Sequence, residues 1–209
     1  MHFFPDADLR TQKALAAILG RLGGLFLRME QKYDEAARAY GFHCDGCAEN
    51  CCETRFYHHT LIEYAFLAQG VETLAQEIRE SVLTQAVAVV DKTLAADKAG
   101  RKIRIMCPLN RNQRCIAYAY RPMICRLHGI AHELHSPNGG ILRGQGCRQF
   151  DACAQGKPYF RFDRTPFYRE MAILEQEARL ITGMTHKIKM TVADMLMAQH
   201  RITRKDSPP

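Results

Sequence analysis

The stretch CDGCAENCC, residues 44–52, places four cysteines within nine residues and ends in the adjacent pair Cys51 and Cys52. Cys44 and Cys47 form a C-x-x-C element, which presents two sulfurs to one metal ion. Adjacent residues point about 100° apart on a helix and to opposite sides of a strand, so Cys51 and Cys52 are not expected to face one ion together. Either the pair is divided between two centres, which we favour, or one of the two is not a ligand and the fourth ligand comes from elsewhere.

A second group of cysteines lies downstream, and both arrangements of the vicinal pair predict that the two groups meet in space. Thiolates are soft ligands that favour zinc, iron–sulfur clusters or Cu(I) over magnesium or calcium. Spacing alone does not separate zinc from a four-iron cluster, because each takes four such ligands. The predicted metal ligands are Cys44, Cys47, Cys51, Cys52, Cys107, Cys115, Cys125 and Cys147, which leaves Cys153 without a predicted role.

The composition is that of a globular protein, with 209 residues of which 47% are hydrophobic and 24% charged. No apolar run of about 18 residues occurs, so we expect no membrane span. The start, MHFFPDADLR, lacks the basic and apolar regions of a signal peptide, so we expect a cytoplasmic location. In that reducing compartment, clustered cysteines are more often metal ligands or redox groups than disulfides.

The charge does not indicate a nucleic-acid partner. The net charge is +7, but the chain has no tryptophan and no stripe in which basic and aromatic residues accompany each other. The chain also lacks the G-x-G-x-x-G, Walker A and G-x-S-x-G motifs, so nucleotide binding and a hydrolase nucleophile elbow have no support.

Apolar residues at spacings of three and four predict a mainly α fold. Helices are expected at about 7–40, 53–69, 71–98, from Thr165 to Gly183, and at 185–200. A short strand is expected at 103–107 and a small hairpin around HSPNGG, residues 135–140. We expect a single domain over 1–209, with an N-terminal helix at 1–43, a cysteine-cluster core at 44–155, C-terminal helices at 156–200 and a disordered tail at 201–209. Helices thus frame a loop-rich middle that a metal would hold together.

The cysteine cluster and the later segment CIAYAYRPMICRLHG, residues 115–129, resemble the YkgJ-like CxxCxxCC cysteine-cluster family. The similarity spans about 44–150 and includes Cys107-Pro108 and Cys147. It differs in having three residues, not two, before the vicinal pair. The resemblance implies a zinc- or iron-chelating domain, and some members are called Fe–S oxidoreductases. The matching segment reads Cys…Tyr-x-x-Arg-Pro-x-x-Cys-Arg, here Cys115, Tyr118 or Tyr120, Arg121, Pro122, Cys125 and Arg126.

Arginines and histidines adjoin the cysteines. A tetrathiolate zinc site and an oxidised four-iron cluster with four thiolates each carry two net negative charges, so Arg121 and Arg126 are predicted to balance that charge or donate to the sulfurs. An anionic-substrate or nucleic-acid site and plain solvated surface are the alternatives. Histidines that could replace a cysteine ligand, with His128 the strongest candidate, are His43, His58, His59, His128, His132 and His135.

The sequence therefore predicts a cytoplasmic metalloprotein that binds one or more iron–sulfur clusters, with [4Fe–4S] favoured, or other iron. A redox or electron-transfer role with a redox or protein partner is expected, and Fe–S oxidoreductase activity is its enzymatic form. One alternative is a structural zinc module that mediates a partner interaction. Another is an iron-dependent enzyme with histidine ligands. Nine cysteines exceed what one structural zinc needs, which favours the first hypothesis.

Overall fold

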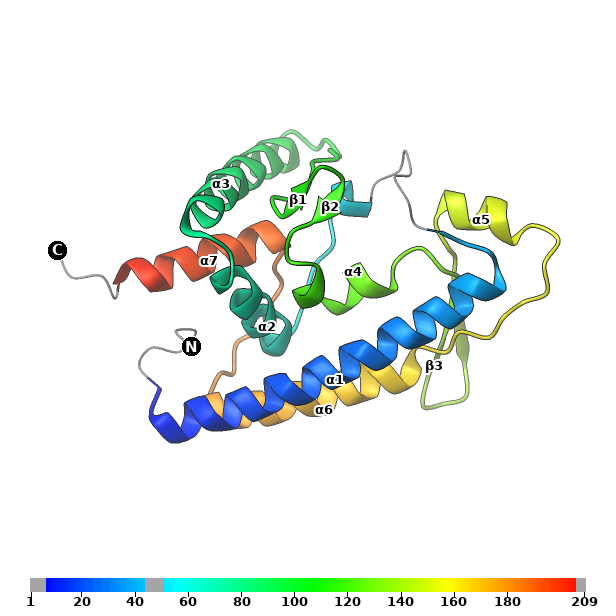
Figure 1. Ribbon diagram of the computed structural model, residues 1–209, viewed down its shortest axis with the longest axis horizontal. Coiled ribbons are helices and arrows are strands. Elements are labelled where there is room, and N and C mark those ends of the chain that lie inside the picture. Colours follow the sequence, from blue (N-terminus) through cyan, green and yellow to red (C-terminus); the bar gives the residue numbers. More distant parts are fainter. Residues whose placement is uncertain (1–6, 44–50, 206–209) are drawn as a thin grey trace.

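The computed structural model describes residues 7–43 and 51–205 and is mainly helical (Figure 1), which confirms the predicted fold class. The α-helices are α1 (Leu9–Ala39), α2 (Leu61–Glu72), α3 (Gln76–Lys98), α4 (Met123–Leu127), α5 (Arg148–Ala154), α6 (Thr165–Thr182) and α7 (Val192–Lys205). Two antiparallel strand pairs join β1 (Asn110–Arg111) to β2 (Arg114–Cys115) and β3 (His132–His135) to β4 (Ile141–Gly144). Two short 3-10 helices are η1 (Cys51–Glu53) and η2 (Tyr118–Tyr120).

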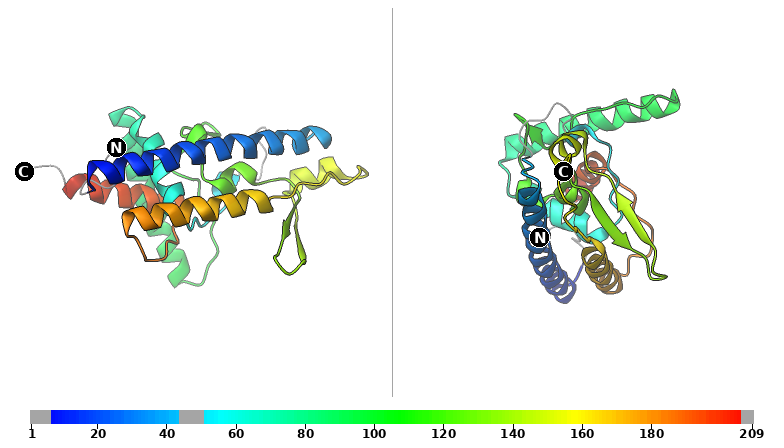
Figure 2. Two further views of the ribbon diagram at one scale, coloured as in Figure 1. Left: turned by 90° about the horizontal axis from the view of Figure 1, so that it is seen from below. Right: turned by 90° about the vertical axis from the view of Figure 1, so that its right-hand side faces the viewer.

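The longest helix, α1, lies along α6 in both views of Figure 2. Asp8 begins α1 by accepting a hydrogen bond from the Thr11 N–H at 2.7 Å, as N-cap residues do. One apolar stripe of the helix is buried, and its three glycines do not interrupt it. The helix ends before Gly41, whose φ of 56° suits the left-handed stop. Gly183, with φ 68°, ends α6 in the same way, as the sequence predicted.

α2 lies between the α1–α6 pair and the α3–α7 pair (Figure 1) and is buried over most of its length. Thr60 caps it, and Glu175 of α6 accepts the N–H groups of Leu61 and Ile62 at 2.9 and 3.1 Å. These acceptors explain why the helix begins at Leu61 and not near residue 53 as expected. The residues before it are extended instead, and His58 exchanges two main-chain hydrogen bonds with Met190.

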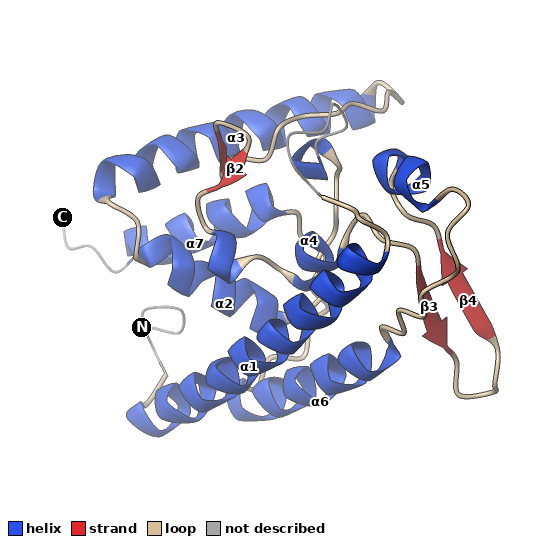
Figure 3. Cartoon of the chain, turned by 45° about the vertical axis from the view of Figure 1, so that its right-hand side comes forward, coloured by secondary structure: helices blue, strands red, loops and turns tan. Residues whose placement is uncertain are grey.

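The middle of the chain contains short elements that periodicity did not predict, namely β1, β2, α4 and α5. The hairpin expected around residues 135–140 is present and protrudes from the helical body (Figure 3). The strand expected at 103–107 is not formed, because this segment meets η1: the Cys107 N–H donates to the Cys52 carbonyl at 2.8 Å. α7 continues through the first five residues of the tail expected to be disordered, and residues 206–209 are not described.

Buried side chains of α1, α2, α4, α6 and α7 form one hydrophobic cluster. None of the helices within residues 7–43 and 51–205 combines the length and the apolar character needed to span a bilayer.

Candidate metal centre

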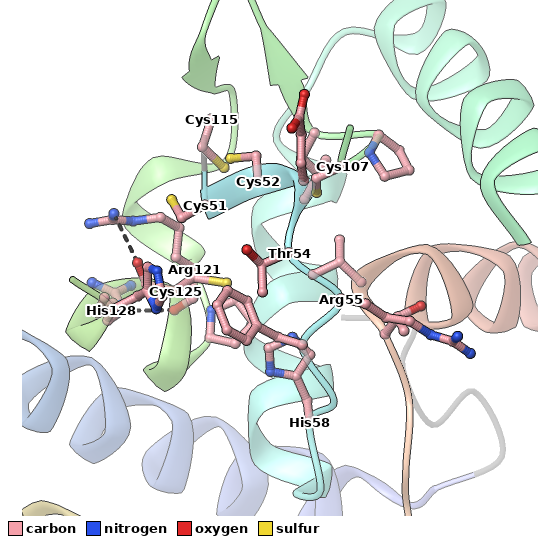
Figure 4. A pocket seen from close by; sticks show the side chains of 18 of the residues that line it. Cys51, Cys52, Thr54, Arg55, His58, Cys107, Cys115, Arg121, Cys125 and His128 are labelled. Atoms are coloured by element: carbon pink, nitrogen blue, oxygen red, sulfur yellow. Dashed lines mark hydrogen bonds between the residues drawn. The ribbon is translucent and has the colours of Figure 1, made fainter. Parts of the chain in front are cut away.

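Six cysteines line one cavity of about 640 Å³. They come from five separate segments of the chain, and Figure 4 shows five of them around the same space. Seven cysteines lie within the described ranges, and all seven are half-buried. The cavity cysteines are Cys51 and Cys52 in η1, Cys107 in the loop before β1, Cys115 at the end of β2, Cys125 in α4 and Cys147 at the start of α5.

Main-chain hydrogen bonds bring the first four of these cysteines together. Cys107 is joined to Cys52 as described above, and Asn110 donates back to the Cys107 carbonyl at 2.9 Å. Asn112 and Gln113 both have positive φ, 50° and 64°, which is the backbone of a tight two-residue hairpin turn. This turn reverses the chain between β1 and β2 and pairs Cys115 with Asn110. The described cysteines of the first group, Cys51 and Cys52, therefore meet cysteines of the second group in space, as the sequence predicted.

The remaining two cavity cysteines are held from the other side. Glu63 of α2 accepts the Met123 N–H at 2.9 Å, which fixes the first turn of α4 and with it Cys125. The Cys147 N–H donates to the Gly129 carbonyl at 2.9 Å. Gly129 has φ 108° and closely approaches the rings of Tyr33 and Phe42, so it has to be glycine. α5 and the segment after α4 are thus tied together beside the cavity.

The two thiols of the vicinal pair interact with each other. The Cys51 thiol donates a hydrogen bond to Cys52, and this is the first cause that lowers the pKa of Cys52 to about 6. The Asn110 side chain and the positive charge of Arg121 act in the same direction. Both residues leave a single three-residue 3-10 turn, and whether they serve one centre or two stays a prediction.

The other thiols resist ionisation. Burial raises the pKa of Cys107 to about 12 and also raises the pKa values of Cys115 and Cys125. Negative charge on Cys52 adds to the effect at all three positions. These thiols are close enough to act on one another, and a bound cation would favour their ionised forms because it would neutralise the charge they gain.

Arg121 lies beside the thiols, and its charge lowers the pKa values of Cys52, Cys115 and Cys125. Its guanidinium stacks 3.4 Å from the centre of the Tyr118 ring and donates to the Tyr118 carbonyl at 3.0 Å. Its position is the one expected of a residue that balances negative charge in the cavity.

Arg126 is placed differently. It is 5% exposed, and its three guanidinium nitrogens donate to the Arg121 carbonyl, to Glu30 and to the Ala119 carbonyl. Its guanidinium also lies over the Phe26 ring of α1. All three guanidinium nitrogens of Arg126 thus donate to oxygen atoms. Its positive charge nevertheless lowers the pKa of Cys115. Sequence spacing gave no signal for the Glu30 contact, because α1 is remote in sequence.

Two of the predicted histidines, His58 and His128, line the cavity. His58 is 2% exposed, and neither of its ring nitrogens has a hydrogen-bond partner. His128 is half-buried and stacks against Phe56 at 5.1 Å between ring centres. His59 instead approaches the Ile188 carbonyl at 3.2 Å, and His135 pairs with Glu133 at 2.9 Å. Sequence reasoning ranked His128 first among the candidate histidine ligands, whereas the structure buries His58 more completely.

The potential metal ligands line the same cavity, but their side chains are not arranged as a coordination site. Within residues 7–43 and 51–205, no three histidine, cysteine or carboxylate side chains are arranged to hold a metal ion. Two predicted ligands, Cys44 and Cys47, lie outside the described residues. Cys153 lies on α5 and is not among the residues that line the cavity.

Comparisons with protein family models, curated proteins and solved structures found no match to this chain. The resemblance to the YkgJ-like cysteine-cluster family therefore stays a prediction.

Proposed function

We propose that this chain is a metalloprotein whose cavity cysteines bind an iron–sulfur cluster, with [4Fe–4S] favoured over separate iron ions. The observation that carries the proposal is the convergence of six cysteines from five chain segments on one cavity. A scattered set of cysteines that act as small hydrophobes would have no reason to converge in this way.

The residues present fit such a group in softness and in charge. Thiolate sulfur is the ligand that iron–sulfur clusters require. Arg121 supplies positive charge beside a centre whose ligands bring negative charge. The raised pKa values of Cys107, Cys115 and Cys125 mean that metal binding would release thiol protons, so affinity should rise with pH. When bound, an iron–sulfur cluster supplies one-electron transfer.

The role that we propose is redox or electron transfer with a redox or protein partner, and Fe–S oxidoreductase activity is its enzymatic form. We place the protein in the cytoplasm, where a reducing environment keeps thiols free for a metal.

Structural zinc is the second candidate, and the length of the elements around the cavity favours it. η1, β2, α4 and α5 have three, two, five and seven residues. Elements this short are not stable alone, and a closed zinc site with four thiolates would hold them without doing chemistry.

Anaerobic purification, followed by a visible spectrum and metal analysis, tests both candidates. An iron–sulfur protein will be brown, will contain iron and sulfide, and will lose visible absorption on reduction. A colourless protein with stoichiometric zinc would refute the cluster and support the structural role. A protein without bound metal under these conditions would refute both.

Two cysteine variants make the test specific to the cavity. Cys125→Ala removes a thiol that lines the cavity, and we expect its metal content to fall at least tenfold. Cys153→Ala is the matched control, because Cys153 is also a free, half-buried cysteine in a short helix but lies outside the cavity. Equal metal losses in both variants would contradict the proposed site.

A further inference from the structure

His58 is a buried polar side chain whose hydrogen-bonding needs are not met. It is 2% exposed, and both ring nitrogens lack a partner. Its closest acidic neighbour is Glu63, with 3.9 Å between Nδ1 and Oε1, which is too long for a hydrogen bond. The Glu63 oxygens already accept the Thr60 hydroxyl at 2.6 Å and the Met123 N–H at 2.9 Å. Buried polar groups in proteins are nearly always satisfied, so an unmet pair of nitrogens points to a missing partner.

The position of His58 is fixed by its main chain. Its N–H donates to the Met190 carbonyl at 2.8 Å, and the Met190 N–H donates back at 3.0 Å. The ring therefore enters the interior from a rigid two-residue bridge. Burial lowers the pKa of His58 to about 4, so the imidazole is neutral at pH 7 and carries a free lone pair.

The unmet nitrogens belong to a residue that lines the cysteine cavity, and Figure 4 shows His58 with Cys125 and Thr54 in its wall. A neutral imidazole is a common ligand for zinc and iron and is compatible with thiolates in one coordination sphere. His128 also lines the cavity, but it is half-buried and stacks against Phe56. Among the described residues, His58 is therefore the nitrogen donor that gains most from a metal.

We propose that His58 provides an imidazole nitrogen ligand to the metal centre of this cavity, which then has mixed sulfur and nitrogen coordination. The inference rests on the proposed function, because it needs a metal in the cavity. A neutral nitrogen in place of one thiolate makes the centre less negative by one charge. In an iron–sulfur cluster, such a replacement raises the reduction potential.

The test uses the full chain loaded anaerobically with ferrous iron and sulfide, with histidine labelled by ¹⁴N or ¹⁵N. Pulsed EPR of the reduced cluster will show a strong nitrogen coupling that changes with the label. The coupling will disappear in His58→Cys, which keeps a metal-binding side chain at the position, while iron content falls less than twofold. The reduction potential of His58→Cys will become more negative. If the wild type binds zinc instead, the cobalt(II)-substituted proteins are compared, and the wild-type visible bands will be those of a mixed sulfur and nitrogen site.

The controls are His59→Gln, outside the cavity, and His128→Gln, inside it. Both will retain the nitrogen coupling. Because His58 and His128 are the two described histidines that line the cavity, a coupling that survives in His128→Gln assigns the ligand to His58 even if His58→Cys does not fold. A wild type that binds metal without nitrogen coupling, a coupling that persists in folded His58→Cys, or its loss in His128→Gln would overturn this inference and leave the proposed function intact. A wild type that binds no metal overturns both.

Discussion

Arg121 and Arg126 are five positions apart and both reach Glu30 Oε1, but their other neighbours differ. Arg121 faces the thiols and lowers their pKa values. Arg126 is an interior cation that joins Glu30 of α1 to two carbonyls of the segment before α4. Burial lowers the pKa of Arg126, and the Glu30 charge opposes that change. The two residues look alike in sequence and both line the cavity, yet Arg126 also holds the packing around it.

Replacement of Arg126 should therefore affect stability more than replacement of Arg121. Arg126→Ala leaves two carbonyls without their donor, and we expect it to lower the free energy of unfolding by about 2–4 kcal/mol. Arg121→Ala, whose side chain is more exposed, should cost about 1 kcal/mol or less. Urea unfolding of both variants without metal measures the difference. Equal losses would contradict the assignment of Arg126 to packing.

At single residues, the sequence predicted that the cysteines assemble but did not predict their detail. The spacing of the cysteines and the softness of sulfur can be read from the sequence. They were enough to predict that Cys51 and Cys52 lie near Cys107, Cys115 and Cys125. The burial of His58 depends on its bridge to Met190, which no local pattern encodes. The hydrogen bond within the vicinal pair likewise depends on a short 3-10 turn that periodicity cannot reveal.

Among the elements, α2 positions the segment that carries Arg121 through a close approach at Gly70. A Cβ built on Gly70 would lie 2.2 Å from Cγ of Tyr120, which belongs to η2. The Tyr120 ring thus packs directly on the helix backbone, and η2 ends where Arg121 begins. Only glycine allows this contact, because every other residue would push η2 away from α2.

Gly70→Ala should lower the free energy of unfolding by about 2–3 kcal/mol, because the added methyl group overlaps the Tyr120 ring. The matched control is Gly20→Ala in α1, where a Cβ meets nothing within 4 Å. That variant should gain about 0.5–1 kcal/mol from the better helix propensity of alanine. Thermal and urea unfolding report both changes, and a neutral Gly70→Ala would show that η2 moves freely.

Element prediction succeeded where the pattern was long. The apolar stripes of α1, α3 and α6 gave their type and approximate bounds. The start of α2 shifted because Glu175, which is 114 residues from Leu61, accepts its first N–H groups. β1, β2, α4 and α5 have at most seven residues, too few for a period to be visible. The segment 103–107 has the residues of a strand, but its main chain meets η1 instead.

Within residues 7–43 and 51–205, three histidines have lowered pKa values. Burial is the first cause that lowers the pKa values of His58, His128 and His132. The positive charge of Arg164, 2% exposed and bound to the Leu127 and Ile130 carbonyls, adds to the effect at the last two. The folded chain therefore binds fewer protons than the unfolded chain once the pH falls below the ordinary histidine value.

This difference predicts loss of stability in mild acid. The free energy of unfolding keeps its full value above a pH of about 6.5. It decreases as the pH falls, because the unfolded chain binds protons on these histidines before the folded chain does. Between pH 7 and 5 the loss should be on the order of 1–2 kcal/mol. Urea unfolding of the metal-free chain measures it. In His132→Phe, which removes one of the groups away from the cavity, the decrease should be shallower, and an unchanged slope would contradict the account.

The bridge between His58 and Met190 has a consequence for synthesis. The neighbouring contact between His59 and Ile188 joins positions 129 residues apart, and at about 5–20 residues per second a ribosome needs roughly 6–26 s to cover that distance. The last five cysteines are made during this interval, and even after Cys153 one wall of their cavity does not yet exist. We therefore expect a group that needs the complete cavity to be delivered after translation has passed Met190.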